Sequence, residues 1–176
     1  MRTFEVHHFV SFEETNLVGN VYFVNHLRWQ GFCREQFLRE RVPHLAAQLR
    51  DVLALVTVRC SCEYLAEVVV FDEIIVRMSL GSLSRNRMTL EFDYYRTTSG
   101  VEELIARGFQ EIACMHRRGD ELKPGPFPAE LVEALEPFRV RGRLGAALDP
   151  PDRAAPTSAA IGLKCLDSVA AATEDL

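Results

Sequence analysis

The spacing of apolar residues changes period along the N-terminal part of the chain. Apolar and polar residues alternate over 3–12, which predicts a strand with one buried face. A polar segment then breaks the alternation, and Gly19 is typical of a turn. A helix is predicted from about Val24, with Asn20 or Asn25 as its cap. The pattern therefore places a polar loop between a strand and a helix.

The predicted helix is apolar on nearly every side, which is typical of a helix enclosed by other elements. Its apolar residues persist to Leu38, and Pro43 forces a break soon afterwards. A short second helix is expected over 43–50. The apolar residues of the long helix and of the segment that leads into it are Val21, Tyr22, Phe23, Val24, Leu27, Trp29, Phe32, Cys33, Phe37 and Leu38.

Four long strand-like runs follow, at 52–70, 73–84, 87–98 and 101–117. Short polar connectors of hairpin type separate them, and two of the runs alternate between apolar and polar residues. This pattern predicts an antiparallel sheet with one solvent-exposed face and one buried face. A last helix is expected over 129–138. The fold class is therefore α+β, with one long helix inserted after the first strand of an antiparallel meander.

The amino-acid composition of the chain changes at Arg139. The residues from there to the C-terminus are rich in Ala, Pro, Asp and Arg and contain no aromatic side chain. A chain of 176 residues has the usual length of one domain. We therefore expect a single domain over 1–138 and a mobile or weakly structured tail over 139–176.

Charge and composition narrow the classes of function. The net charge of −5 argues against a nucleic-acid partner. The N-terminus has no signal-peptide pattern, and no apolar run approaches the roughly 18 residues of a membrane span. We therefore expect a cytoplasmic protein with no membrane partner. Cys60 and Cys62 share a strand face, but no second pair with metal-ligand spacing follows, so neither a metal nor another cofactor is expected.

One charged residue interrupts the apolar helix. Arg34 falls in the same helical row as Leu27 and Gly31. A buried, unpaired guanidinium would cost several kcal/mol, so Arg34 needs an anion, a cluster of carbonyl groups or a water-filled pocket. Gly31, one turn away, would let a strand or a ligand chain approach the helix backbone. The ordinary alternative is that Arg34 reaches the surface or pairs with Glu63 or Glu67.

The start of the same helix offers a second candidate feature. The first N–H groups of a helix have no partner within the helix, and its dipole is positive there. A carbonyl oxygen at this position would gain stabilisation as negative charge develops on it. Gly19 permits close approach, and the N–H groups of residues 21–24 are the candidate donors. An ordinary capped helix fits the same spacing.

The segment 15–35 resembles the signature of hot-dog acyl thioesterases of the 4-hydroxybenzoyl-CoA thioesterase-like superfamily, T-D-x-x-G-x-V-x-x-x-N-Y-L-x-W-x-x-x-x-R-E. The likeness continues to about residue 136. It implies a hot-dog fold, in which an antiparallel sheet wraps around a central helix, and hydrolysis of an acyl thioester. The residues that match the signature are Thr15, Gly19, Val21, Asn25, Leu27, Trp29, Arg34 and Glu35.

Two positions depart from this signature. Asn16 stands where the family has an aspartate that serves as base or nucleophile, and His26 stands where it has a tyrosine. Loss of the acid with retention of the arginine resembles the enediyne-biosynthesis branch. Those thioesterases release a polyene, built as a β-keto acyl thioester, from the carrier domain of an iterative polyketide synthase. The resemblance implies that Asn16 and Arg34 are catalytic and that Thr57 lines the site. It also implies substrate-binding or oxyanion roles for Gly19, Val21, Tyr22 and Asn25.

The same resemblance implies an acyl carrier domain as partner and a homo-oligomer, either dimer or tetramer. Asn16 cannot act as a general base, but it can orient water or donate to the thioester carbonyl. Arg34 can stabilise the charge that develops on the carbonyl or β-keto oxygens. Glu13 and Glu14 lie close to Asn16 and could supply a base, but they stand in an exposed-looking turn, so we expect them to be solvated.

Two other functions stay open from the sequence. One is a general acyl-CoA thioesterase, for which basic residues would bind the nucleotide phosphates. The other is a non-catalytic acyl-binding hot-dog module, for which loss of the carboxylate is the natural sequence mark. The arginines available for the nucleotide phosphates are Arg85, Arg87, Arg117 and Arg118.

Overall fold

The computed structural model describes residues 2–49, 52–119 and 121–140. The chain forms an antiparallel sheet in the order β1-β3-β4-β5-β2, with β6 paired to β5. In chain order the elements are β1 (Phe4–Phe9), the 3-10 turn η1 (Phe12–Glu14), α1 (Val24–Arg41), α2 (Pro43–Gln48), β2 (Leu53–Tyr64), β3 (Glu73–Leu83), β4 (Arg87–Thr98), β5 (Val101–Arg118), β6 (Glu121–Pro124), α3 (Ala129–Leu135) and the 3-10 turn η2 (Glu136–Phe138).

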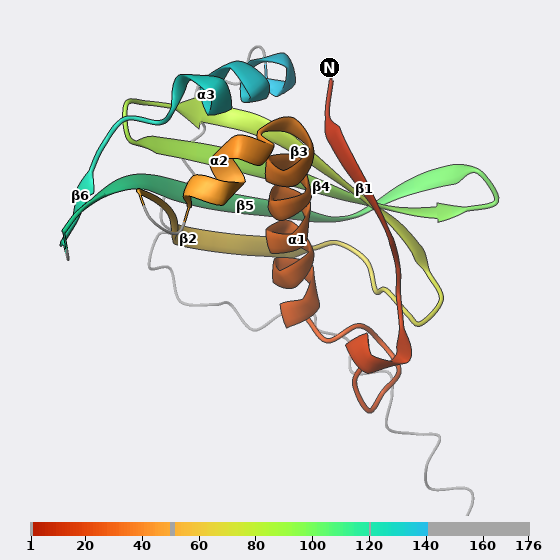
Figure 1. Ribbon diagram of the computed structural model, residues 1–176. Coiled ribbons are helices and arrows are strands. Elements are labelled where there is room, and N and C mark those ends of the chain that lie inside the picture. The colour runs from red at the N-terminus through yellow and green to blue at the C-terminus, as the bar shows by residue number, and fades with distance from the viewer. Residues whose placement is uncertain (1, 50–51, 120, 141–176) are drawn as a thin grey trace, which may run out of the picture. The chain divides into compact units, whose positions relative to one another are not determined.

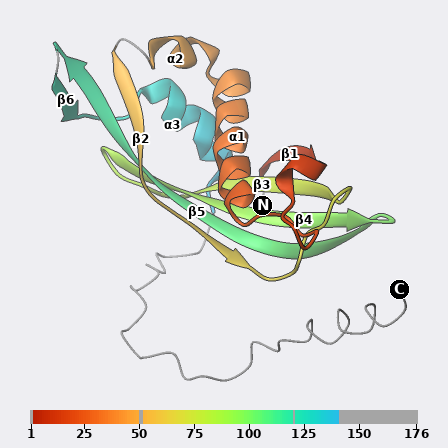
Figure 2. The same cartoon turned by 90° about the horizontal axis from the view of Figure 1, so that it is seen from below.

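The sheet curls around α1, which lies across its concave face (Figures 1 and 2). Helices α2 and α3 lie on the same side of the sheet as α1. The α+β class expected from the sequence is therefore confirmed. All strand pairs are antiparallel, but only β3, β4 and β5 follow one another as a meander, because β2 pairs with β5 and β1 pairs with β3. The expectation of a meander throughout the sheet is therefore wrong. Strand β6 is an addition that the sequence pattern did not predict. It is short and fully exposed, so it carries no alternation of buried and exposed residues.

Strict alternation builds the core between the sheet and the helix. In β4, Met88, Leu90, Phe92 and Tyr94 are buried, while the residues between them are partly exposed. Helix α1 contributes Trp29, Cys33 and Phe37 to the same core, and each of the three is at most 5% exposed. Burial of such side chains contributes roughly 1.5–3 kcal/mol each and fixes α1 against the sheet.

The start of α1 differs from the prediction in its cap. The helix begins at Val24 as expected, but Phe23 is its N-cap residue and no side chain caps it. Asn25 lies inside the helix and donates to the carbonyl of Glu14 at 2.7 Å instead. The predicted cap by Asn20 or Asn25 is therefore wrong, because the amide of Asn25 is engaged by the preceding turn.

Helix α1 is not enclosed on every side within one chain. Val24 and Phe32 are 36% and 46% exposed, so part of the apolar surface of the helix faces outward within one chain. The reason lies in β2, the end strand of the main sheet path, which pairs with β5 alone. All residues over 56–61 of β2 are exposed, although strand alternation would bury every second one. One long edge and one side of the helix are thus open.

The predicted tail falls almost wholly outside the described residues. Arg139 and Val140 are described, and the N–H of Val140 donates to the Leu80 carbonyl in β3 at 2.9 Å. Residues 141–176 are not described, so the expectation of a mobile tail stays a prediction. Among the described helices, none is both long enough and apolar enough to cross a membrane.

Candidate active site

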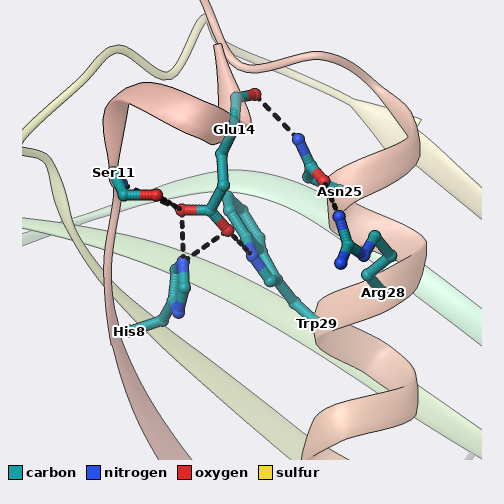
Figure 3. Close-up of polar contacts among 6 residues, drawn as sticks. All are labelled: His8, Ser11, Glu14, Asn25, Arg28 and Trp29. Atoms are coloured by element: carbon teal, nitrogen blue, oxygen red, sulfur yellow. Dashed lines mark hydrogen bonds and ion pairs between the residues drawn. The ribbon is translucent and has the colours of Figure 1, made fainter.

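The loop before α1 is organised around the carboxylate of Glu14 (Figure 3). One carboxylate oxygen accepts from the indole N–H of Trp29 at 2.7 Å. The other accepts from the backbone N–H of Ser11 at 2.9 Å and from its hydroxyl at 3.2 Å. His8 in β1 lies 2.9 Å from the carboxylate through Nε2. A single acid therefore joins β1, the 3-10 turn η1 and α1.

The backbone carbonyl of Glu14 makes two further contacts. It accepts from the N–H of Tyr22 at 2.8 Å and from the side-chain amide of Asn25 at 2.7 Å. Asn25 is buried and also accepts from Arg28 at 3.3 Å. The two ends of the loop over 15–23 are therefore tied together at Glu14.

The environment of Glu14 keeps it ionised. Burial by itself would raise the pKa of Glu14, but the hydrogen bonds from Ser11, Trp29 and His8 outweigh it, and the net pKa is lowered. Glu14 is only 9% exposed, so the expectation of a solvated side chain is wrong for this residue. Glu13 is exposed as expected. The spacing Ser11-x-x-Glu14 is a capping-box signature that could have marked the contact with Ser11. The contacts with His8 and Trp29, six and fifteen residues away, have no such local signal.

Asn16 lies in the exposed part of the same loop. Its side-chain oxygen accepts from the N–H of Val18 at 3.0 Å, and its carbonyl accepts from the N–H of Gly19 at 3.0 Å. Gly19 has φ +91°, a conformation that favours glycine, and no atom lies within 4 Å of where a Cβ would be. Within the described residues, the amide N–H₂ of Asn16 makes no hydrogen bond. The turn thus holds Asn16 by its oxygen and leaves its donors open.

Two of the four candidate backbone donors at the helix start are already engaged. The N–H of Val21 donates to the Val68 carbonyl at 2.7 Å, and that of Tyr22 donates to Glu14. In the part of the chain that the structure describes, the N–H groups of Phe23 and Val24 have no acceptor. The structure thus narrows the donors expected over 21–24 to these two. Val21 is buried and Tyr22 is half exposed.

Arg34 lies between α1 and the open end of the sheet. Its guanidinium donates to the Thr57 hydroxyl in β2 at 2.8 Å and to the Gln110 side-chain oxygen in β5 at 3.2 Å. Burial lowers the pKa of Arg34, and the charge of Glu35 opposes the shift only in part. No carboxylate among the described residues forms an ion pair with Arg34. The alternative of an ion pair with Glu63 or Glu67 is therefore excluded among the described residues, and the partners of this cation are neutral oxygens.

Asn16 and Arg34 are not brought together within one chain. The hydrogen bonds of Asn16 stay inside its own loop. Arg34 comes ten residues after Val24, the first residue of α1, which corresponds to roughly 15 Å along the helix axis. The described chain therefore presents two separate polar regions, one at the start of α1 and one at its middle.

His26 lies on the buried side of the helix start. Its ring contacts Trp29, Tyr64 and Tyr94, with centroid distances of 4.8, 5.0 and 5.6 Å. Burial lowers the pKa of His26 to about 4, while the Phe23 carbonyl opposes the shift. The imidazole is therefore neutral at pH 7 and serves as an aromatic packing residue there.

The described residues contain no group of three or more His, Cys, Asp or Glu side chains placed to hold a metal ion. Cys60 and Cys62 in β2 are free thiols, the first exposed and the second partly buried. Burial raises the pKa of Cys62 to about 11, so its reactive thiolate form is scarce at neutral pH.

Comparison with known proteins places this arrangement in a family context. Residues 10–135 match the profile of the Thioesterase-like superfamily. The crystal structure of the dynemicin thioesterase, solved to study polyene binding, is 48% identical over 79% of this chain and 99% of that chain, with a TM-score of 0.76. No curated protein matches the sequence significantly.

Two more distant structures share the fold. A 1,4-dihydroxy-2-naphthoyl-CoA thioesterase from Synechocystis is 22% identical and has a TM-score of 0.67, over 76% of this chain and 96% of that chain. The 4-hydroxybenzoyl-CoA thioesterase from Pseudomonas sp. strain CBS-3 is 18% identical and has a TM-score of 0.63, over 76% of this chain and 99% of that chain.

Proposed function

Because the chain belongs to the Thioesterase-like superfamily, with a sheet wrapped around a helix in the hot-dog manner, we propose that it hydrolyses a polyene acyl thioester. The proposed substrate is a β-keto polyene carried by the acyl carrier domain of an iterative polyketide synthase in an enediyne-type pathway. The likeness to the dynemicin thioesterase supports this choice, since that protein binds a polyene and the two chains are 48% identical.

The observation that carries the proposal is the set of neutral partners around Arg34. Thr57 and Gln110 hold the guanidinium in place without neutralising it. A carbonyl oxygen that becomes negative during attack would find an uncompensated cation in a partly buried site, where electrostatic stabilisation is strongest. The planar fork of arginine also suits two oxygens at once, such as those of a β-keto thioester.

Asn16 and the start of α1 would supply the rest of the site. The free amide donors of Asn16, with the open N–H groups of Phe23 and Val24, can hold the thioester carbonyl or the attacking water. Water adds to the carbonyl carbon, the carbon–sulfur bond breaks, and the carrier thiol leaves while the excess proton passes to solvent. This chemistry has no carboxylate base, which suits a substrate whose acyl carbon is already activated by the β-keto group.

We propose that the active site is completed between copies of the chain. Asn16 and Arg34 lie in separate regions of one chain, and the open edge of β2 carries Thr57 beside Arg34. Long open edges are typically covered by association. A homo-oligomer, dimer or tetramer, is therefore expected. Light scattering at assay concentration tests this, and a stable, fully active monomer would contradict it.

The decisive experiment offers the protein two kinds of thioester. We expect it to release the acid from a carrier domain loaded with a β-keto polyenyl chain faster than it hydrolyses simple acyl-CoAs, as measured by mass analysis of the product. Faster hydrolysis of the acyl-CoAs would favour a general acyl-CoA thioesterase. Binding without turnover of either substrate would favour an acyl-binding module. The reaction is proposed for the cytoplasm, where the free thiols Cys33 and Cys114 would stay reduced.

A further inference from the structure

We propose that Glu14 is a positioning residue of this site, whose carboxylate holds the Asn16 loop and the open donors of α1 in one arrangement. The inference rests on the proposed thioester hydrolysis. It assigns to Glu14 a role distinct from the base that the chain lacks at position 16.

The side chain of Glu14 is too well satisfied to serve as a base. It receives hydrogen bonds from the N–H and hydroxyl of Ser11 and from the indole of Trp29, and it contacts His8. These donors leave little lone-pair capacity for a water molecule. Figure 3 shows them converging on the carboxylate from β1, from the turn and from α1. The acid therefore acts as a junction between three elements.

The backbone of Glu14 transmits this placement to the site. Its carbonyl accepts from Tyr22 and Asn25, the residues that flank Phe23 and Val24 with their open N–H groups. On the other side, Asn16 follows Glu14 by two residues, and Thr15 bridges to Val21 across the loop. A displacement of Glu14 would move Asn16 and the backbone donors relative to each other. Misplacement by about 1 Å can cost a site on the order of 10²-fold in rate.

The chain provides a matched control at the adjacent position. Glu13 has the same charge and lies in the same 3-10 turn, but its side chain is exposed. Glu13→Gln removes one carboxylate charge near Asn16 without removing any contact at the junction. A general effect of local charge would therefore appear in both variants, and an effect of positioning would appear only in Glu14→Gln.

Glu14→Gln keeps the shape of the side chain but turns one acceptor into a donor that faces other donors. We expect kcat to fall about 10-fold or more with KM changed little, because the loop contacts that matter most form in the transition state. Trp29, the only tryptophan of the chain, reports the junction directly. Its emission should shift in Glu14→Gln and stay unchanged in Glu13→Gln.

The experiment measures kcat, KM, Trp29 emission and melting temperature for the full chain and both variants on the carrier-bound polyenyl thioester. A lower melting temperature with an unchanged kcat, assayed well below melting, would overturn the proposal. Equal losses in Glu13→Gln and Glu14→Gln would also overturn it. Should Glu14→Gln fail to fold, Trp29→Phe removes the indole donor to Glu14 and keeps a smaller aromatic ring at the same position. A several-fold fall in its kcat supports the proposal, and a wild-type kcat overturns it.

Failure of the proposed function gives a different result. In that case the unaltered chain hydrolyses no thioester at all, whereas the emission of Trp29 still shows whether Glu14 holds the junction. An active wild-type chain with a fully active, folded Glu14→Gln variant would instead leave the function standing and remove only the role of Glu14.

Discussion

Two charged side chains, Glu14 before α1 and Arg34 at its middle, are both shielded from water, but their hydrogen-bond partners differ. Glu14 is surrounded by donors, and these outweigh burial so that its pKa is lowered. Arg34 has two neutral acceptors, and burial prevails so that its pKa is lowered as well. For the acid this shift favours the charged form, and for the base it disfavours the charged form. The carboxylate of Glu14 thus has its hydrogen-bond partners within the chain, whereas the guanidinium of Arg34 has no anion as a partner among the described residues.

This contrast separates a structural region from a reactive one. A charge with every hydrogen bond made stabilises the fold and has nothing left to offer a ligand. A partly desolvated charge without a counter-ion costs stability and is kept where a ligand supplies the missing partner. Glu14 contacts the start of α1 through Asn25 and Trp29, so this junction also helps to orient the helix that carries Arg34.

Removing Arg34 is the strongest way to break this comparison. Arg34→Ala should lose on the order of 10²-fold or more in turnover, because the dominant stabilisation of the developing charge disappears. Arg34→Lys should not restore full activity, since a point charge lacks the planar fork. Steady-state kinetics on the β-keto thioester measures both. Arg39→Ala, at an exposed position of the same helix, is the control and should keep wild-type turnover.

The stability of the Arg34→Ala variant tests whether this arginine contributes to the fold. Because Arg34 has no acidic partner among the described residues, Arg34→Ala should fold and melt close to the wild type. A normal fold with near-full activity would show that the arginine has no catalytic role. A large loss of melting temperature would place Arg34 with Glu14 as a structural charge.

Substitutions of Asn16 sharpen the account of the loop. Asn16→Ala removes both the open amide donors and the hydrogen bond to Val18, and turnover should fall by about 10-fold from looser placement of the carbonyl or water. Asn16→Asp keeps the acceptor for Val18 and restores an acid. It should not greatly accelerate β-keto hydrolysis. An Asn16→Asp variant that becomes an efficient acyl-CoA hydrolase, from a silent wild type, would favour the acyl-binding module.

Thr57 offers a smaller test of how Arg34 is held. Thr57→Val keeps the branched shape but loses the hydroxyl that accepts from the guanidinium at 2.8 Å. Turnover should fall several-fold, since the guanidinium loses one of its two hydrogen bonds and keeps the one to Gln110. Thr57→Ser keeps the hydroxyl and should retain most of the activity. Equal rates for the two variants would show that Gln110 alone is enough to place Arg34.

The pH dependence of stability tests Glu14 without any substrate. The pKa of Glu14 in the folded chain lies below its ordinary value of 4.5, so its ionised form adds stability above that pH. This contribution is lost as the pH falls through the folded pKa. The difference in free energy of unfolding between wild type and Glu14→Gln should therefore be largest near pH 7 and shrink below pH 4.5. Denaturant titrations measure it, with Glu13→Gln as a variant that should show no such trend.

Local pattern was enough to predict most of the fold. Period-two alternation marks β3 and β4, and the apolar run with its proline break marks α1 and α2, because these signals arise within a few residues. The same signal does not say which apolar side chains of α1 are covered by the sheet of its own chain. Apolar residues such as Phe32 do face outward in one chain, and a sequence does not say whether its own sheet or a second copy covers them.

The candidate site was predictable only where it is local. The turn at Gly19 and the misplaced charge of Arg34 are visible in sequence order. The role of Glu14 is not, because its partners come from three elements that meet only after folding. The neutral partners of Arg34 lie 23 and 76 residues away along the chain. Thr57 was expected in the site only through the family resemblance, and the contact with Gln110 was not predicted.

The open edge of β2 has a consequence for how the protein behaves on dilution. Thr57 lies on that edge and touches Arg34, so association along β2 would order the same residues to which we assign substrate binding in the proposed mechanism. The fraction of active sites would then depend on protein concentration in the same way as the fraction of associated chains. Specific activity per chain would rise with protein concentration and level off once association is complete, and substrate would in turn favour the assembled form. Thr57 thus links quaternary equilibrium to turnover.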